Sequence, residues 1–170
     1  MKVRSTQLNS KNCIICGMEN DSGLKAPFYN LDDDSVATIV TFKEHHQSYP
    51  DRTHGGMTSA LLDELMGRAL WVNEPEMFGV TTTLNITYRK AVPLNTPVKA
   101  RAVITFNSAR GFSAKGELYS MDNVLLVQGN AKYFKMPFNV AFKEGKSMHE
   151  EMCYQMPLDV DELSFPEMRK

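Results

Sequence analysis

The sequence predicts an α+β domain in which a curved antiparallel sheet wraps around one long helix. Residues 55–73 are the only long stretch of helix formers, and several runs between residues 80 and 134 alternate as strands do. The helix is apolar on most sides, so it must be buried, and only a sheet can cover so much of it. A chain of 170 residues suffices for one hydrophobic core.

Taken in order, residues 1–26 are polar and lack a sustained period, so we expect an irregular N-terminal segment. Residues 28–31 and 36–42 flank an acidic turn and predict a hairpin. Residues 43–53 contain a proline among polar side chains and predict a loop. These limits place the main domain at residues 27–137.

The long helix is predicted to begin at Gly55 and to end near Asn73, because Pro75 disfavours helix in the residue before it. Residues 80–88, 98–106, 112–119 and 124–134 then predict strands, and Asp122 and Asn123 suit a tight turn between the last two. Residues 138–170 are rich in Met and acidic side chains. We expect them to form a C-terminal extension with one short helix at residues 146–154.

Charge and composition restrict the class of partner. Lys and Arg number 19 against 20 Asp and Glu, a formal net charge of −1, so the basic field that attracts nucleic acids is absent. No apolar run approaches the roughly 20 residues that cross a bilayer, and the first residues do not resemble a secretory signal. We therefore expect a cytoplasmic protein that binds neither nucleic acid nor membrane and acts on a small molecule.

The start of the long helix has features of a ligand site. His54 is followed by Gly55 and Gly56, which weaken a helix but let a ligand approach the free N–H groups of its first turn. A glycine-rich turn beside a crowded strand explains the same residues equally well. The motif alone therefore does not decide between the two interpretations.

Asp63 changes this balance. Its neighbours three and four residues away are small or apolar, so the helix offers it no cationic partner, whereas Glu64 has Arg68 at i+4 and is explained as a surface ion pair. A buried carboxylate without a partner favours a catalytic role over a structural one.

Gly56 and Asp63 lie on one face but roughly 10 Å apart along the helix axis, so a single chain cannot bring both to one reacting carbonyl. Two antiparallel helices, packed through their small residues, would place each Asp63 opposite Gly56 of the other chain. We therefore expect a homodimer, or a dimer of dimers, with two identical composite sites.

Several motifs resemble those of a known family. The runs 46–50 and 54–67, residues 13–17 with Gly23 and Leu24, and residues 85–88 are similar to the PaaI-like (phenylacetate-degradation type) hotdog-fold acyl-CoA thioesterases. The resemblance covers roughly residues 12–136. It implies a hotdog fold and hydrolysis of an acyl-CoA to a free acid and coenzyme A at a subunit interface, without a cofactor or a metal.

The resemblance also implies roles for individual residues. The N–H of Gly56 would bind the thioester oxygen, and Asp63 of the other subunit would act as nucleophile or general base. His54 would shape the helix start, and Thr81 would help to hold the water. We expect substrate contacts from a further set in the loop, the first helical turns and a strand end: Gly55, Gln47, Ser48, Ser59 and Lys90.

Other interpretations stay open. The chain could be a non-catalytic acyl-CoA-binding or sensing module on the same scaffold, whereas a hydratase would need a His/Asp pair that the sequence does not show. The spacing of Cys13, Cys16, His149 and Cys153 suits a tetrahedral zinc site, with buried free thiols as the simpler interpretation.

Overall fold

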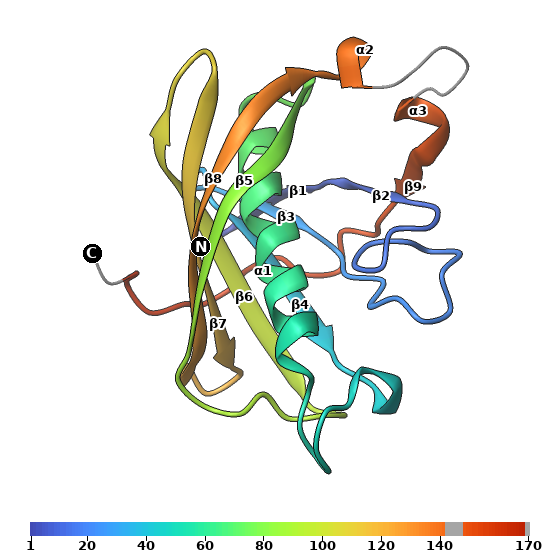
Figure 1. The fold of residues 1–170 in the computed structure, drawn as a ribbon, viewed down its shortest axis with the longest axis vertical. Helices are drawn as coiled ribbons and strands as arrows, with labels where there is room; N and C mark the ends of the chain where they lie inside the picture. The colour runs from blue at the N-terminus through green and yellow to red at the C-terminus, as the bar shows by residue number, and fades with distance from the viewer. Residues whose placement is uncertain (142–147, 169–170) are drawn as a thin grey trace.

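One long helix lies against a seven-stranded antiparallel sheet in the computed structural model, which describes residues 1–141 and 148–168 (Figure 1). The order of the strands across the sheet is β1-β3-β4-β6-β7-β8-β5. The α+β architecture predicted from the sequence is confirmed. The strands of this sheet are β1 Val3–Thr6, β3 Tyr29–Leu31, β4 Val36–Thr41, β5 Met77–Tyr88, β6 Pro97–Asn107, β7 Gly111–Ser120 and β8 Leu125–Pro137.

Most of the predicted strands lie close to their expected positions. The predicted hairpin pairs β3 with β4, while β6, β7 and β8 form the predicted meander. The turn between β7 and β8 contains Asn123 with a φ of 65°, a conformation that asparagine tolerates. Among residues 1–141 and 148–168, β5 pairs with β8 alone, so its other side is an unpaired edge within this part of the chain.

The long helix, α1, spans Gly55–Arg68 and is followed by a 3₁₀ turn, η2, at Ala69–Val72. The predicted start is confirmed, but the α-helix ends about one turn before the expected Asn73. The N–H of Ala69 already bonds both the Gly67 and the Leu65 carbonyls, which marks the change to tighter turns. No helix among the described residues is long and apolar enough to cross a bilayer.

The core lies between α1 and the sheet. Leu61, Leu62, Leu65 and Met66 of the helix are completely buried there. Gly116 on β7 is paired with Gly129 on β8, and a Cβ atom on Gly116 would lie 2.9 Å from the Met66 side chain. These two strand glycines therefore allow the helix to lie close to the middle of the sheet.

The N-terminal segment is more ordered than its composition indicates. β1 joins the sheet beside β3, and β2 (Leu8–Ser10) pairs with β9 (Met152–Gln155) to form a second, two-stranded sheet. The expectation of an irregular segment at residues 1–26 was therefore wrong for these strands. Both are short and polar, and the partners that stabilise them come from distant parts of the chain. The remaining loop covers one side of α1 (Figure 1).

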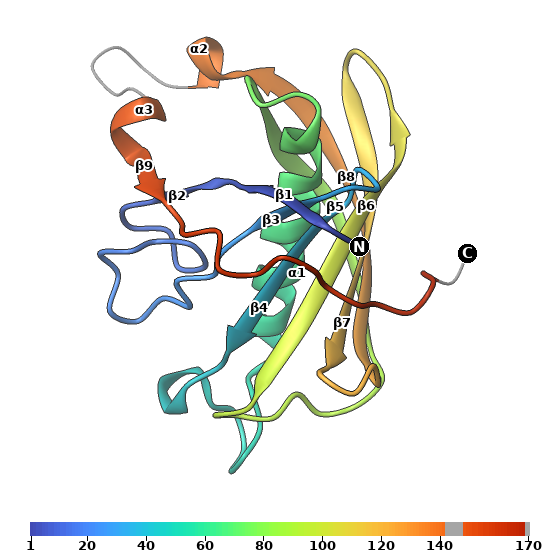
Figure 2. The same cartoon turned by 180° about the vertical axis from the view of Figure 1, so that it is seen from behind.

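The C-terminal extension contains two single-turn helices, α2 (Phe138–Ala141) and α3 (Met148–Glu151). The helix predicted at 146–154 is thus limited to one turn before β9, and residues 146 and 147 lie outside the described residues. Beyond β9 the chain crosses the face of the sheet opposite α1 (Figure 2). There Leu163 and Phe165 pack against Tyr29 and Tyr119. Residues 43–53 form the predicted loop, which includes a short 3₁₀ helix, η1, at Glu44–His46.

Candidate active site

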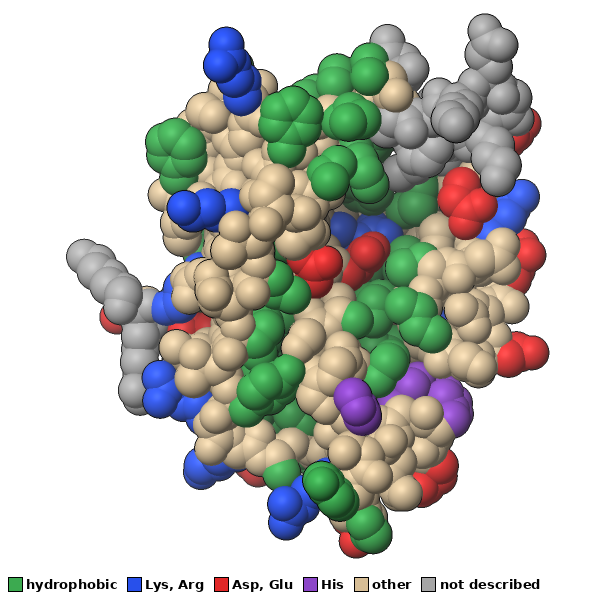
Figure 3. Space-filling view, in the orientation of Figure 1, with side chains coloured by type: hydrophobic (Ala, Val, Ile, Leu, Met, Phe, Trp, Pro, Cys, Tyr) green, Lys and Arg blue, Asp and Glu red, His purple; other side chains and the backbone are tan. Residues whose placement is uncertain are grey.

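Asp63 lies at the wall of a cavity of about 470 Å³ between α1, the sheet and the N-terminal loop. Figure 3 shows acidic side chains in the hollow at the middle of the face that α1 presents. The walls combine apolar and polar groups, as is typical of sites for small molecules. Among the lining residues are Asp63, Glu64, Arg68, Trp71, Thr81 and Tyr133.

Two hydroxyl groups from the sheet hold the Asp63 carboxylate. Thr81 on β5 donates through Oγ1 to Oδ1 at 3.0 Å and lies 3.3 Å from Oδ2. Tyr133 on β8 donates through Oη to Oδ1 at 3.1 Å and to the Asp63 carbonyl at 2.9 Å. Within residues 1–141 and 148–168, no Lys, Arg or His side chain forms an ion pair with Asp63. The unpaired carboxylate predicted from helix spacing is therefore present.

The surroundings change the proton affinity of this site. Burial raises the pKa of the Asp63 carboxyl, and the hydrogen bonds from Thr81 and Tyr133 offset part of that rise. The neighbouring Glu64 carboxylate adds a smaller increase. Burial and the Asp63 charge also raise the pKa of Tyr133, which keeps its phenol protonated as a donor. The arrangement favours a carboxylate that can accept a proton from a reacting group.

The start of α1 is capped by His54. Its Nδ1 accepts the N–H of Gly56 at 2.9 Å, and its carbonyl accepts the N–H of Met57 at 2.9 Å. His54 therefore occupies the N-cap position of α1, where it would shape the helix start, and its part in the reaction stays a prediction. In the single chain the imidazole thus occupies the Gly56 N–H, the donor that was expected to bind the thioester oxygen, and that role stays a prediction. The His54 side chain is exposed. A change of its rotamer would therefore release the Gly56 N–H without disturbing the packing of the core.

The other predicted substrate contacts gather near the start of α1, away from the Asp63 cavity. Tyr88 donates through Oη to the Gly55 carbonyl at 2.9 Å and lies 2.5 Å from Ser59 Oγ. A Cβ atom on Gly55 would lie 3.3 Å from the Tyr88 ring, so the close approach of this ring accounts for the glycine. Exposed positions in the neighbouring loop and just beyond β5 carry the remaining residues, which are Gln47, Ser48 and Lys90.

Sequence reasoning missed Tyr133, which the structure places on Asp63. Its only sequence signal is the alternation of β8, which turns residue 133 toward the helix. Which helical residue it meets depends on how α1 lies across the sheet. Helix spacing showed that no cation lies within one turn of Asp63. It gave no information about the hydroxyl groups that the sheet places on Asp63.

The Glu64–Arg68 pair is not on the surface as predicted. Arg68 Nε donates to Glu64 Oε1 at 2.8 Å, but the Arg68 side chain is only 3% exposed. Its guanidinium stacks over Phe28 at 4.3 Å and donates to the Leu8 carbonyl at 2.9 Å. The N-terminal segment thus folds over this side of the helix and buries the cation.

The predicted zinc ligands are brought together only in part. Cys13 and Cys16 lie in the N-terminal loop and line the same cavity as Asp63. Cys153 is exposed on β9, where Met152 lines the cavity, and adjacent side chains of a strand point in opposite directions. Including Cys153 in the ligand set was therefore wrong. The side chain of His149 lies outside the described part of the structure.

The two loop cysteines differ in their proton affinity. A hydrogen bond from the Cys13 thiol, with a smaller contribution from the Arg68 guanidinium, lowers the pKa of Cys16 to about 6. The same hydrogen bond and burial raise the pKa of Cys13. Of the two thiols, Cys16 is therefore the one whose ionisation the surroundings favour.

Comparisons with known proteins add a family match and a fold. Residues 52–127 match the sequence model described as the thioesterase superfamily. No curated protein sequence matches the chain significantly.

Among solved structures, one described as a thioesterase superfamily protein is 25% identical, with a TM-score of 0.66 over 72% of this chain and 59% of its own. A Bacillus halodurans protein solved with CoA is also 25% identical, with a TM-score of 0.54 over 59% and 66% of the two chains. A thioesterase from Ralstonia eutropha JMP134, described as phenylacetic acid degradation-related, is 18% identical, with a TM-score of 0.59 over 65% and 85%. The hotdog fold predicted from the sequence is confirmed.

Proposed function

We propose that this chain, whose residues 52–127 match the sequence model of the thioesterase superfamily, hydrolyses an acyl-CoA to a free acid and coenzyme A. The proposal depends on Asp63, a half-buried carboxylate held by two hydroxyl donors at the wall of a cavity. The neighbour from Bacillus halodurans was solved with CoA, which supports a ligand of this type.

Hydrolysis adds water to the thioester carbonyl carbon and releases coenzyme A as the thiol. Asp63 can remove the proton from the attacking water, or it can attack the carbon itself and form a mixed anhydride that water then opens. Both routes need an ionised carboxylate close to the carbonyl carbon and a donor at the carbonyl oxygen. Thr81 and Tyr133 would keep the carboxylate in position for either route.

We assign the donor at the carbonyl oxygen to Gly56 of a second subunit. Neither Gly55 nor Gly56 lines the cavity that contains Asp63, so the single chain does not combine the two groups. The edge of β5 is 12 residues long and exposes Val80 and Tyr88. Proteins usually cover an edge of this length, and a second copy of β5 and α1 would do so. The His54 ring must release the Gly56 N–H when substrate binds.

The His54 cap also favours a second candidate, a non-catalytic acyl-CoA-binding module. A donor already bonded within its own chain does not polarise a carbonyl unless the cap opens. In that case the cavity would bind acyl-CoA without turnover.

Thiol release from a panel of acyl-CoAs separates the two candidates. We expect turnover by the wild type and a decrease of about 10²–10⁴-fold for Asp63→Asn, the usual contribution of a positioned acid or base. Asp122→Asn is the matched control, because Asp122 is exposed in the turn between β7 and β8.

Two results would contradict the enzymatic proposal. One is equal rates for the wild type and Asp63→Asn. The other is tight acyl-CoA binding, measured by calorimetry, without release of thiol from any substrate. The second result would establish the binding module.

A further inference from the structure

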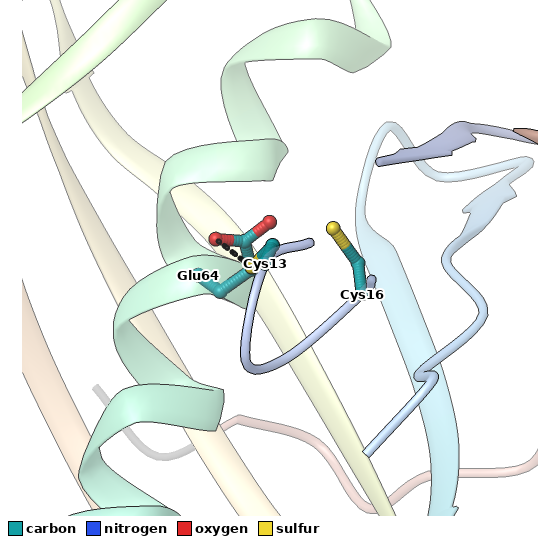
Figure 4. Close-up of side chains that lie close together, drawn as sticks. All are labelled: Cys13, Cys16 and Glu64. Atoms are coloured by element: carbon teal, nitrogen blue, oxygen red, sulfur yellow. Dashed lines mark hydrogen bonds between the residues drawn. The ribbon is translucent and has the colours of Figure 1, made fainter. Parts of the chain in front are cut away.

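Two elements that are far apart in the sequence bring together three side chains that can bind a metal. Cys13 and Cys16 come from the N-terminal loop and Glu64 from α1, and their ligand atoms all lie within 4.8 Å of one another. Figure 4 shows the three side chains grouped between the loop and the helix. Two thiolates and a carboxylate are ligands that Zn²⁺ accepts in a tetrahedral site. We propose that Cys13, Cys16 and Glu64 bind one Zn²⁺ ion.

Hydrogen bonds within and next to the N-terminal loop fix the positions of its two sulfur atoms. The N–H of Ile15 donates to Cys13 Sγ at 3.3 Å, and Ser10 Oγ lies 3.3 Å from Cys16 Sγ. The turn closes with the N–H of Gly17 bonded to the Cys13 carbonyl at 2.8 Å. A Cβ atom on Gly17 would lie 2.4 Å from that carbonyl oxygen, so only glycine allows this turn.

Charge balance supports a divalent ion at this place. Two thiolates and the Glu64 carboxylate carry three negative charges, and Zn²⁺ with the buried Arg68 guanidinium carries three positive charges. Arg68 Nη2 lies 3.0 Å from Cys16 Sγ, and its Nε lies 2.8 Å from Glu64 Oε1. Arg68 would thus orient two of the three ligands while neutralising the site, as outer-shell donors do in metal centres.

The site has room for a fourth ligand. All three proposed ligands line the cavity of about 470 Å³, so water can complete a tetrahedron from that side. The ion would attach the N-terminal loop to α1 beside Asp63 and fix that wall of the cavity. This role is structural and does not depend on the reaction that Asp63 performs.

Metal titration of the full-length, reduced and chelator-treated protein tests the proposal. With Co²⁺ as the probe, we expect about one equivalent per chain, a thiolate-to-cobalt charge-transfer absorption and displacement by Zn²⁺. We expect Cys16→Ser and Glu64→Gln to lose this absorption and Cys153→Ser, with its cysteine on the exposed side of β9, to keep it. Arg68→Lys should weaken binding by about 10–100-fold, the usual effect of an outer-shell donor.

Three results would overturn the assignment. The first is a reduced, folded wild type that shows no cobalt absorption, which would leave the cysteines as a paired thiol and thiolate. The second is full binding by Glu64→Gln, and the third is loss of binding in Cys153→Ser. If Cys16→Ser does not fold, the wild-type titration and Glu64→Gln, which retains both cysteines, still decide the question.

Discussion

At the scale of single residues, Asp63 is stabilised by neutral donors and not by a cation. A salt bridge would lower the pKa of the carboxyl and make it a weak base. Here burial raises the pKa by more than the two hydroxyl hydrogen bonds lower it, and the carboxylate lines the cavity. Tyr133 donates to both the carboxylate and the backbone carbonyl of Asp63. It therefore fixes the position of this helical turn over β8 as well as the orientation of the Asp63 side chain.

Tyr133→Phe should therefore reduce kcat by about 10–100-fold and leave KM nearly unchanged, because a hydrogen bond to an ionised carboxylate contributes about 1.5–3 kcal/mol. Steady-state kinetics on the best acyl-CoA of the panel would measure the two parameters separately. Tyr119→Phe is the matched control, since Tyr119 lies on the opposite face of the sheet. An unchanged kcat in Tyr133→Phe, or an equal loss in Tyr119→Phe, would show that the Tyr133 hydroxyl does not position Asp63.

At the scale of elements, the position of α1 depends on the close approach of the helix to β7 and β8. Gly116 and Gly129 face each other across these two strands, and the Met66 side chain fills the space above them. A methyl group at Gly116 would push the helix away from the sheet or force Met66 out of its rotamer. The height of the helix over the sheet in turn sets the distance between Asp63 and Tyr133.

Gly116→Ala is expected to destabilise the protein by about 1–3 kcal/mol, the usual effect of overpacking a core. Chemical denaturation would measure this free energy of unfolding. The same substitution should cost less in a Met66→Ala background, where the methyl group has space, and a double-mutant cycle would give the coupling. Equal costs in both backgrounds would mean that Met66 is not the group that excludes a side chain at Gly116.

At the scale of the whole molecule, the single chain leaves a long sheet edge and keeps the two proposed catalytic groups, Asp63 and Gly56, apart. β5 carries Thr81, which bonds Asp63, and is also the edge strand that no other described strand covers. A dimer formed through this face would cover the β5 edge and would also bring Gly56 of the second subunit to Asp63. The dimer and the cytoplasmic location remain predictions.

Mixed dimers give a direct test of the shared site. Asp63→Asn and Gly56→Pro, which lacks the N–H but suits a first helical turn, should each abolish activity alone. Co-expressed with different tags and purified as mixed dimers, they should recover about half of the wild-type activity, because one of the two composite sites is then intact. Gly56→Ala, which retains the N–H, serves as the control. Inactive mixed dimers, or a fully active monomer, would contradict the shared site.

The sequence by itself determined the features that depend on local spacing. The alternation of a strand accounts for β4, where Val36 and Val40 join the core under the helix and Ala37 and Ile39 lie on the outer face. The helical repeat showed that Asp63 has no cation within one turn, because that repeat fixes which side chains are neighbours.

Only the tertiary structure decided the contacts that join distant segments. The Tyr133 hydroxyl, the burial of Arg68 and the meeting of Cys13 and Cys16 with Glu64 link residues that lie about 50 to 70 positions apart. Polar loops such as residues 11–27 have no period that predicts where they pack. Their positions follow from which surface of α1 the sheet leaves uncovered, and that depends on the whole fold.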